Sequence, residues 1–297
     1  TLPDSRIKTF EDSGFYVLRN GWTPESTMLI LSSNISSKLQ DSSHNQLDNG
    51  TFELYHSGRN FFPDSGVCSY MKEDDAEVMK LRRWFRQTKA HNTMVLGKSE
   101  DHEDIGAENI SKAEGKLLLK EENADQQLIV TENQGYNDFK HRRAVFYVKQ
   151  PTEFFVLVDE GFGTATGYAK LYFHLCDETS VNNVILDSQE AGAHTTFENN
   201  NLLIRSFGNQ AITLKPFDGR ISYQTDRKYS TRKAYSLVMK KQRSIPVRYI
   251  TILYPVSKVS NQKISAKFTD DPSNSNHVSI EVTIGNQVYP LSFQLKH

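Results

Sequence analysis

Cysteine is scarce in this chain of 297 residues, since Cys68 and Cys176 are its only two. Two cysteines this far apart match neither a disulfide framework nor the paired spacing of a zinc motif. Long apolar runs are missing too: residues 26–31 and 153–158 are the longest, and a membrane-spanning helix needs ~20 apolar residues. We therefore expect two buried thiols and no membrane span.

An excess of charge of one sign is also missing. The chain has 35 Lys and Arg against 36 Asp and Glu, a formal net charge of -1, which excludes the basic footprint of a general nucleic-acid binder. Hydrophobic residues make up only 37%, but 13 Tyr and 17 Phe supply large buried areas per side chain. This composition predicts a folded protein with an aromatic-rich core and no nucleic-acid partner.

Short stretches in which apolar and polar residues alternate recur along the chain. A period of two with many aromatic and β-branched residues is typical of strands. The stretches are residues 14–19, 51–55, 143–149, 154–159, 168–175, 201–207, 211–216, 232–239, 248–255, 278–284 and 287–295. They predict an all-β fold, a large antiparallel multi-stranded β-sandwich with few short helices.

Three pairs of turn-forming residues favour hairpins, namely Asn49-Gly50, Asp218-Gly219 and Gly285-Asn286. The best helix candidate is a short surface helix over residues 74–83, and the acidic residues 97–112 predict a long loop.

A change of composition near residues 215–230 suggests a weak boundary between two parts of the chain. We expect residues 1–215 to form the main β-sandwich and to carry the loops of its catalytic face. Residues 216–297 would complete that sandwich or form a smaller β subdomain.

Ionisable and amide side chains gather beside turn residues in residues 43–54, 61–66 and 82–93. A rigid sheet can present such side chains to a cleft, although an isolated His or Asp in a loop is more often a structural hydrogen-bonder. We expect His141 and His174 to be structural in this sense. The sequence places His56, His102, His194 and His277 in polar, solvent-exposed surroundings.

These segments resemble the C-terminal half of the heparinase II/III family, and most of all its heparinase III branch, the heparan-sulfate lyases of Bacteroidetes. The similarity rests on HNQLDNGTF at 44–52, PDSG at 63–66, RWFRQTKAHNT at 83–93, FYVLR at 15–19, HRR at 141–143 and FHL at 173–175. The resemblance covers most of the chain.

The resemblance implies a polysaccharide lyase in which an N-terminal α/α toroid is joined to this β-sandwich. Such enzymes cleave uronic-acid polysaccharides by β-elimination where the two domains meet. The chain lacks runs of paired amphipathic helices, so we expect the toroid, with the Asn and Tyr that it provides, to lie outside this sequence. By resemblance His44 is the catalytic residue of this half.

Elimination at a uronate needs a group that neutralises the carboxylate, a base for the C5 proton and an acid for the departing oxygen. Histidine suits proton transfer because its ordinary pKa of ~6.5 lies near the working pH. A sulfated uronic-acid polymer also needs cationic contacts, for which Arg83, Arg86 and Lys89 are the candidates. The competing interpretation pairs the two arginines with the acidic residues 73–77. Of the neighbouring aromatic residues Trp84 and Phe85, taken as strand residues, we expect one to lie in the core.

The resemblance further implies a divalent cation held by Gln46, Asp64 and His91 behind the catalytic histidine. Gln46 stands where zinc-binding relatives have a histidine, and its amide oxygen is a harder ligand, so we expect calcium or manganese rather than zinc. A plain hydrogen-bonded cluster of the three side chains is the alternative.

Two other functions fit the same sequence features. One is a lyase for alginate or another uronate polymer, and the other is a carbohydrate-binding sandwich without catalysis. For the lyase, the resemblance implies a periplasmic or secreted bacterial protein.

Overall fold

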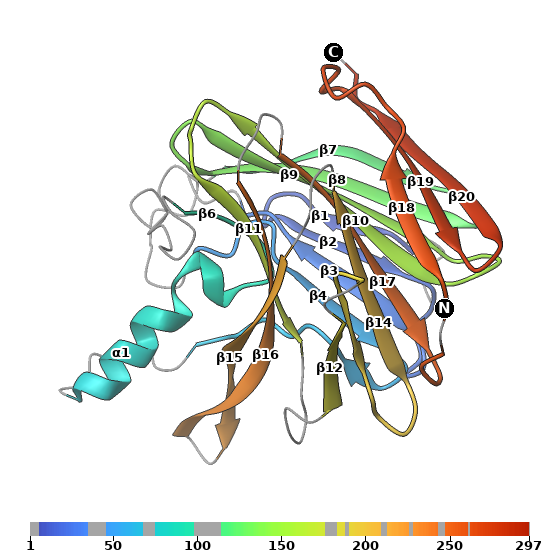
Figure 1. Cartoon of the computed structure of the whole chain (residues 1–297). Coiled ribbons are helices and arrows are strands. Elements are labelled where there is room, and N and C mark those ends of the chain that lie inside the picture. Colours follow the sequence, from blue (N-terminus) through green and yellow to red (C-terminus); the bar gives the residue numbers. More distant parts are fainter. Residues whose placement is uncertain are drawn as a thin grey trace.

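The computed structural model describes residues 6–34, 46–67, 75–97, 114–175, 183–187, 190–208, 213–225, 228–242, 247–260 and 262–296. Within these ranges the chain forms four antiparallel sheets and very little helix (Figure 1). No helix in the same ranges is long and apolar enough to cross a membrane. The predicted all-β, multi-stranded sandwich is confirmed.

The largest sheet has eight strands in the order β12-β13-β14-β17-β10-β9-β8-β7. Their bounds are β7 (Gly115–Glu122), β8 (Gln126–Tyr136), β9 (Phe139–Val148), β10 (Phe154–Gly163), β12 (Val184–Asp187), β13 (Gly192–Thr195), β14 (Asn201–Gly208) and β17 (Val247–Val256).

Three smaller sheets surround this central sheet. The five-stranded sheet contains β1 (Lys8–Phe10), β2 (Phe15–Arg19), β3 (Thr27–Ser32), β4 (Phe52–His56) and β5 (Arg59–Asn60). The four-stranded sheet contains β15 (Thr213–Thr225), β16 (Lys228–Gln242), β11 (Tyr168–Leu175) and β6 (Met94–Gly97). The three-stranded sheet contains β18 (Ile264–Phe268), β19 (His277–Ile284) and β20 (Gln287–Gln294).

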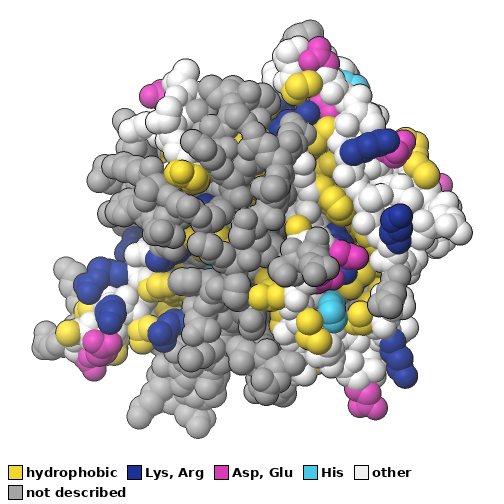
Figure 2. All heavy atoms as spheres, viewed as in Figure 1, with side chains coloured by type: hydrophobic (Ala, Val, Ile, Leu, Met, Phe, Trp, Pro, Cys, Tyr) yellow, Lys and Arg dark blue, Asp and Glu magenta, His cyan; other side chains and the backbone are white. Residues whose placement is uncertain are grey.

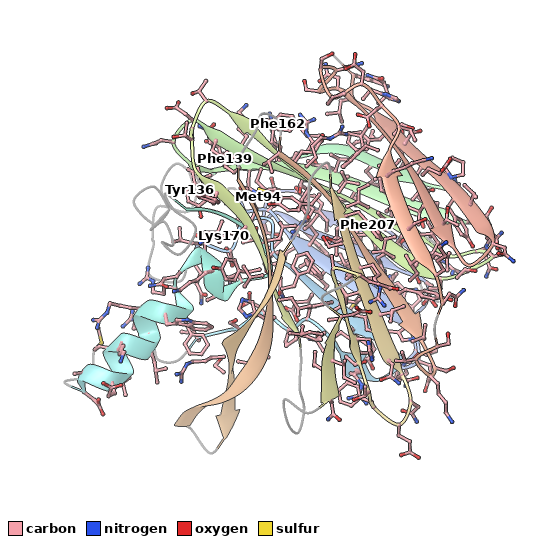
Figure 3. The ribbon with its side chains drawn as sticks, in the orientation of Figure 1. Met94, Tyr136, Phe139, Phe162, Lys170 and Phe207 are labelled. Carbon is pink, nitrogen blue, oxygen red and sulfur yellow. The ribbon has the colours of Figure 1, made fainter. Side chains whose placement is uncertain are left out.

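Both faces of the central sheet are buried. Side chains alternate between the faces of a strand, so Phe155 and Leu157 of β10 enter one core while Phe154 and Val156 enter another. The first core lies against the five- and four-stranded sheets, and the second lies against β18–β20. Figure 3 shows the side chains of both, with Met94 and Phe139 of the first and Phe207 beside the second labelled. Burial on both faces explains why the central strands have nearly continuous apolar runs.

The single α-helix of the described residues is α1 (Ala76–Phe85), followed by the 3-10 turn η2 (Thr88–Ala90). Asp75 caps α1 by accepting hydrogen bonds from the backbone N–H groups of Glu77 and Val78. Trp84 and Phe85 therefore end a helix and do not lie on a strand as expected. Phe85 is buried, as expected of one of the pair, and Trp84 is partly buried.

One of the three predicted hairpins is confirmed and two are wrong. Gly285-Asn286 joins β19 to β20 with Gly285 at φ +62°. Asp218-Gly219 lies within β15, paired with β16, because tertiary strand pairing overrides the local turn preference. Asn49-Gly50 forms a turn that leads into β4, but its strand partner is β3, which ends at Ser32. The predicted loop at 97–112 lies almost wholly outside the described residues.

The expected division after residue 215 falls inside β15. Of the strands beyond it, β17 lies between β10 and β14 in the central sheet, whereas β18–β20 form a sheet of their own. The division into two structural parts at this position stays a prediction.

The packing of β19 provides a test of the second core. Ile280 is 1% exposed there, so we expect Ile280→Ala to lower the free energy of unfolding by ~2–5 kcal/mol through lost burial and a cavity. Thr283 lies on the opposite face of the same strand. We expect Thr283→Ala to change the free energy of unfolding by only ~0.5 kcal/mol or less. Urea unfolding of both variants measures the difference, and equal losses would contradict this placement of β19.

Candidate functional site

Apart from Arg83 on α1, the predicted site residues that the structure describes lie in three segments that are not part of any strand. Residues 46–51 lead into β4, residues 61–67 follow β5, and residues 86–93 join α1 to β6. Such segments have no ladder of strand hydrogen bonds, so their buried backbone groups need side-chain partners. The partners found here determine the shape of the site.

Asn92 is the side chain that joins these segments, and it is 0% exposed. Its Nδ2 donates to the carbonyl oxygens of Phe52, Phe62 and Pro63 at 3.0 to 3.3 Å. Its Oδ1 accepts the backbone N–H of His174 on β11 at 2.6 Å. The amide of Asn92 therefore joins β4, the 61–67 segment and β11 next to His91.

The turn at residues 48–51 is fixed by its neighbours. The Thr51 N–H donates to the Asp48 carbonyl, and Thr93 Oγ1 donates to the Asn49 carbonyl at 2.7 Å. Gly50 has φ +81°, and a Cβ there would lie 2.9 Å from Thr93 Oγ1 and 3.0 Å from His141 Nδ1. Glycine is required by both the backbone conformation and the lack of space.

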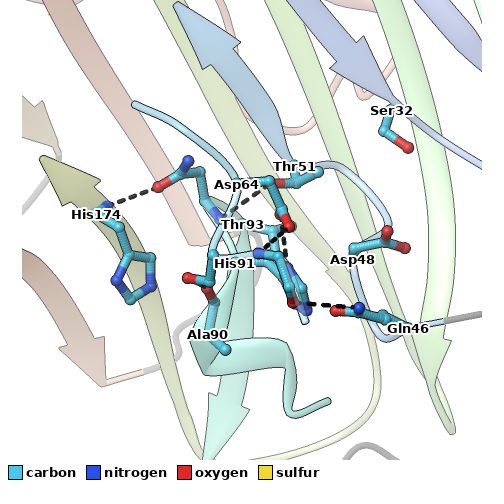
Figure 4. A network of polar contacts seen from close by, with 12 residues as sticks. Ser32, Gln46, Asp48, Thr51, Asp64, Ala90, His91, Thr93 and His174 are labelled. Carbon is cyan, nitrogen blue, oxygen red and sulfur yellow. Dashed lines mark hydrogen bonds and ion pairs between the residues drawn. The ribbon is translucent and has the colours of Figure 1, made fainter. Parts of the chain in front are cut away.

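Asp64 and His91 form a direct pair, shown in Figure 4. The distance between His91 Nδ1 and Asp64 Oδ2 is 2.7 Å, and Asp64 Oδ1 accepts the N–H of Gly66 at 2.8 Å. Burial raises the pKa of Asp64, but the charge and hydrogen bond of His91 and the Gly66 N–H outweigh it, so the net pKa is lowered. Burial likewise lowers the pKa of His91, and the carboxylates of Asp64 and Asp48 with the Phe85 carbonyl raise it above its ordinary value.

Gln46 lies beside this pair. Its Nε2 donates to the Gly66 carbonyl at 3.3 Å, and the dashed line in Figure 4 marks this contact. Gln46 Oε1 and His91 Nε2 are both buried, and neither has a hydrogen-bond partner of good geometry among the described residues. The structure thus brings Gln46, Asp64 and His91 together, with two acceptor-capable atoms left over.

Asp48 is a charged neighbour that the sequence analysis did not single out. Burial raises its pKa to about 6, although His91 opposes the rise, Asp64 adds to it and Asn34 Nδ2 donates to its carboxylate. Its presence in the segment 44–52 was the only sequence signal. Asn92 was missed in the same way, because its role depends on carbonyls from distant strands.

The proposed cationic contacts lie at the end of α1 and just after it. Arg83 is exposed on the last turn, and Arg86 and Lys89 are partly exposed. Figure 2 shows dark-blue side chains gathered over this helix, whose basic residues include Lys80, Arg82 and Arg83. Glu77 pairs with Lys80 at 4.0 Å, and neither Arg83 nor Arg86 pairs with a carboxylate in the described ranges. The competing pairing is therefore not seen there.

Of the other histidines, His141 and His174 are buried and His56 is partly buried. His141 and His174 are buried hydrogen-bonders, as predicted: His141 Nε2 lies 2.6 Å from Asp159 Oδ1, and His174 Nε2 lies 2.8 Å from the Lys89 carbonyl. Burial lowers the pKa of His174 to about 4, so its ring is neutral and donates to that carbonyl. His56 was expected at the surface but is partly buried, with Nδ1 2.7 Å from Thr27 Oγ1, and its pKa is lowered by burial.

Two predicted histidines cannot be placed. His44, the expected catalytic residue, and His102 lie outside the described residues. In the sequence His44 precedes Gln46 by two positions.

The fold and this cluster define a class: an antiparallel β-sandwich whose loops bring together an amide, a carboxylate and a buried imidazole. Residues 2–268 match the family described as heparinase II/III-like, C-terminal. The chain belongs to that family.

Similar proteins agree with this assignment. The chain is 48% identical to the heparin-sulfate lyase of Bacteroides thetaiotaomicron, over 99% of this chain and 40% of that protein. It is 34% identical to the heparin-sulfate lyase of Bacteroides stercoris, over 99% of this chain and 41% of the relative. A crystal structure of heparinase III has 47% identity and a TM-score of 0.84, covering 99% of this chain and 43% of that one. The chain thus spans less than half the length of these relatives.

The role of Asn92 can be tested with an isosteric change. In Asn92→Asp a carboxylate oxygen replaces the amide that donates to three carbonyls, so we expect the free energy of unfolding to fall by ~3 kcal/mol. Asn199→Asp makes the same change at an exposed position and is expected to cost little. Thermal and urea unfolding compare the two, and similar stabilities would show that Asn92 does not hold the segments together.

Proposed function

We propose that this chain is the C-terminal sandwich of a polysaccharide lyase that cleaves heparan sulfate by β-elimination at uronic acid. The observation that carries the proposal is the identity of 48% over 99% of the chain to a protein named heparin-sulfate lyase. Because the chain corresponds to 40% of that relative, the rest of the enzyme, an α/α toroid, would supply the other groups of the active site.

Within this proposal His44 serves as the proton-transfer or charge-neutralising residue of the sandwich. Imidazole can take or give a proton near neutral pH, which elimination requires twice. The segment that follows it is held by partly buried hydrogen bonds of Gln46 and Asp48 and by close packing at Gly50, and a catalytic group needs such a fixed support.

The substrate would contact Arg83, Arg86 and Lys89. These side chains are at least partly exposed near η2, whose Lys89 carbonyl is anchored by His174. Guanidinium groups bind sulfate and carboxylate with two parallel hydrogen bonds, so a sulfated uronic-acid polymer fits this end of α1.

We also propose a divalent cation at Gln46, Asp64 and His91. The fit rests on two buried atoms beside the Asp64 carboxylate, Gln46 Oε1 and His91 Nε2, neither of which makes a hydrogen bond of good geometry in the described residues. Asp64 would supply negative charge and orient the His91 ring, as carboxylates do for metal-binding histidines. The described residues contain no group of three or more His, Cys, Asp and Glu that could hold a metal ion, so further oxygens from backbone or water would have to complete the shell. The amide oxygen of Gln46 is a harder ligand than an imidazole, which favours calcium or manganese over zinc. The ion would stiffen the site.

A periplasmic or secreted location is proposed on the family resemblance alone. Measuring the enzyme in periplasmic, secreted and cytoplasmic fractions of its source tests it.

The proposed activity is tested with the full-length enzyme and its His44→Ala variant. We expect wild type to release unsaturated products, followed by ultraviolet absorbance, from heparan sulfate faster than from heparin or alginate. His44→Ala should lower kcat by ~10²-fold or more, as expected on losing a positioned acid or base. His277→Ala, a change on β19, is the matched control and should retain activity.

Each arm of that experiment has a contrary outcome. Faster turnover of alginate would show that heparan sulfate is not the preferred substrate. Near-normal kcat in His44→Ala would show that His44 takes no part in the reaction. Binding of heparan sulfate without turnover by the full-length enzyme would favour the carbohydrate-binding alternative.

The cation site is tested by thermal unfolding of chelator-treated protein with added Ca²⁺, Mn²⁺ or Zn²⁺. A bound ion at 100 times its Kd stabilises the fold by ~2.7 kcal/mol, so we expect Tm to rise with Ca²⁺ or Mn²⁺. Gln46→Ala should remove the rise, and Gln294→Ala, an exposed change on β20, should keep it. If Tm is indifferent to all three ions, the cluster is a hydrogen-bonded structure only.

A further inference from the structure

Arg143 on β9 is a buried cation that the proposed reaction does not use directly. Its side chain is 0% exposed, and its Nε donates to Asp159 Oδ1 on β10 at 2.7 Å. Asp159 also faces His141, whose Nε2 is 2.6 Å from the same oxygen. The three residues form a charged cluster on the face of the central sheet that points to the first core.

The charges in this cluster are well defined. Burial raises the pKa of Asp159, but Arg143 and His141 outweigh it and lower the pKa below its ordinary value, so Asp159 is ionised. Burial lowers the pKa of His141 in spite of Asp159, so the ring is neutral and donates from Nε2. A carboxylate with two donors on one oxygen fixes the plane of the Arg143 guanidinium.

The other end of that guanidinium reaches the site. Arg143 Nη1 donates to the carbonyl of Gly50 and, at 2.7 Å, to the carbonyl of Asn92. Gly50 lies in the turn that contains Asp48, and Asn92 follows His91 directly. One donor group on a rigid strand therefore sets the distance between two loops that are far apart in the sequence.

Two other arginines of the central sheet do not reach these loops. Arg142 and Arg248 lie on the other face, in register with Glu160. Arg248 Nε is 3.1 Å from Glu160 Oε1, and its Nη2 is 2.8 Å from Asp270 Oδ2 beyond β18. Arg248 is 1% exposed and pairs with two carboxylates, and its contacts lead to the three-stranded sheet.

We propose that Arg143 is a positioning residue of the active site, which holds the loop of Gln46 and Asp48 against the loop of His91 through the carbonyls of Gly50 and Asn92. The proposal rests on the proposed lyase function. Lysine cannot replace Arg143, because one ammonium group on a flexible chain cannot bond Asp159 and both carbonyls in fixed directions.

The test compares Arg143→Lys with Arg248→Lys in the full-length enzyme. Both variants remove a buried guanidinium that is paired with carboxylate and keep the positive charge, so both should lower Tm. Only Arg143→Lys should lower kcat on heparan sulfate, by ~10–100-fold with KM within ~2-fold, because misplaced supporting groups reduce the rate of a bound complex. Arg248→Lys should keep kcat within ~2-fold of wild type.

Amide hydrogen exchange gives a readout that does not depend on turnover. In Arg143→Lys we expect faster exchange in peptides covering residues 46–52 and 89–94, where the N–H groups of Thr51 and Asn92 make buried bonds. Arg248→Lys should leave those peptides protected. Should wild type be inactive on every polymer, the proposed function fails while this comparison still decides the role of Arg143.

Thr93 provides a gentler variant if Arg143→Lys does not fold. Its hydroxyl makes an independent bond between the same two loops, to the Asn49 carbonyl at 2.7 Å. Thr93→Val should lower kcat and speed exchange in residues 46–52, and Thr93→Ser should restore both. The proposal is overturned if Arg143→Lys and Thr93→Val keep wild-type kcat and exchange, or if Arg248→Lys loses as much kcat as Arg143→Lys.

Discussion

The shape of the candidate site depends on one constraint: buried backbone carbonyls need hydrogen-bond donors. Three irregular segments meet beside the first core, and water does not reach their buried backbone carbonyls. A buried carbonyl without a hydrogen-bond donor costs ~1–3 kcal/mol. The Asn92 amide and the Arg143 guanidinium meet this need by bonding carbonyls on four different segments. The same bonds that stabilise the fold therefore fix the relative positions of Gln46, Asp64 and His91.

The central sheet provides a rigid support for these bonds, because it is buried on both faces. Two adjacent residues of β9 point in opposite directions, Arg142 to the side of β18–β20 and Arg143 to the site. Two adjacent residues of β10 pair with them: Glu160 lies beside Arg142 and Asp159 beside Arg143. Both sides of the sheet thus carry a buried ion-pair network at the same level, which gives the strands a fixed register.

Sequence patterns were reliable where one local rule governs an element. Alternating residues on β19 and β20, with Gly285 at a positive φ between them, form the predicted hairpin because strand pleat and turn chemistry agree there. At Asp218-Gly219 the turn signal failed, because pairing with the long β16 outweighs the preference of two residues. Trp84 and Phe85 were assigned to a strand because a pair of aromatics has no period, whereas the Asp75 cap begins a helix that ends with them.

The strand-rich fold could be predicted from composition and periodicity, and the family from short contiguous motifs. The grouping of Gln46, Asp64 and His91 was predicted only through the resemblance to that family. The fold was needed to show that His91 bonds Asp64, that Asp48 lies in the same electrostatic surroundings, and that Asn92 and Arg143 bond carbonyls of the loops. The physical reason is that each of these roles is defined by partners on other strands. A carbonyl looks the same at every position of a sequence, and only the fold brings particular ones within reach of one amide or one guanidinium.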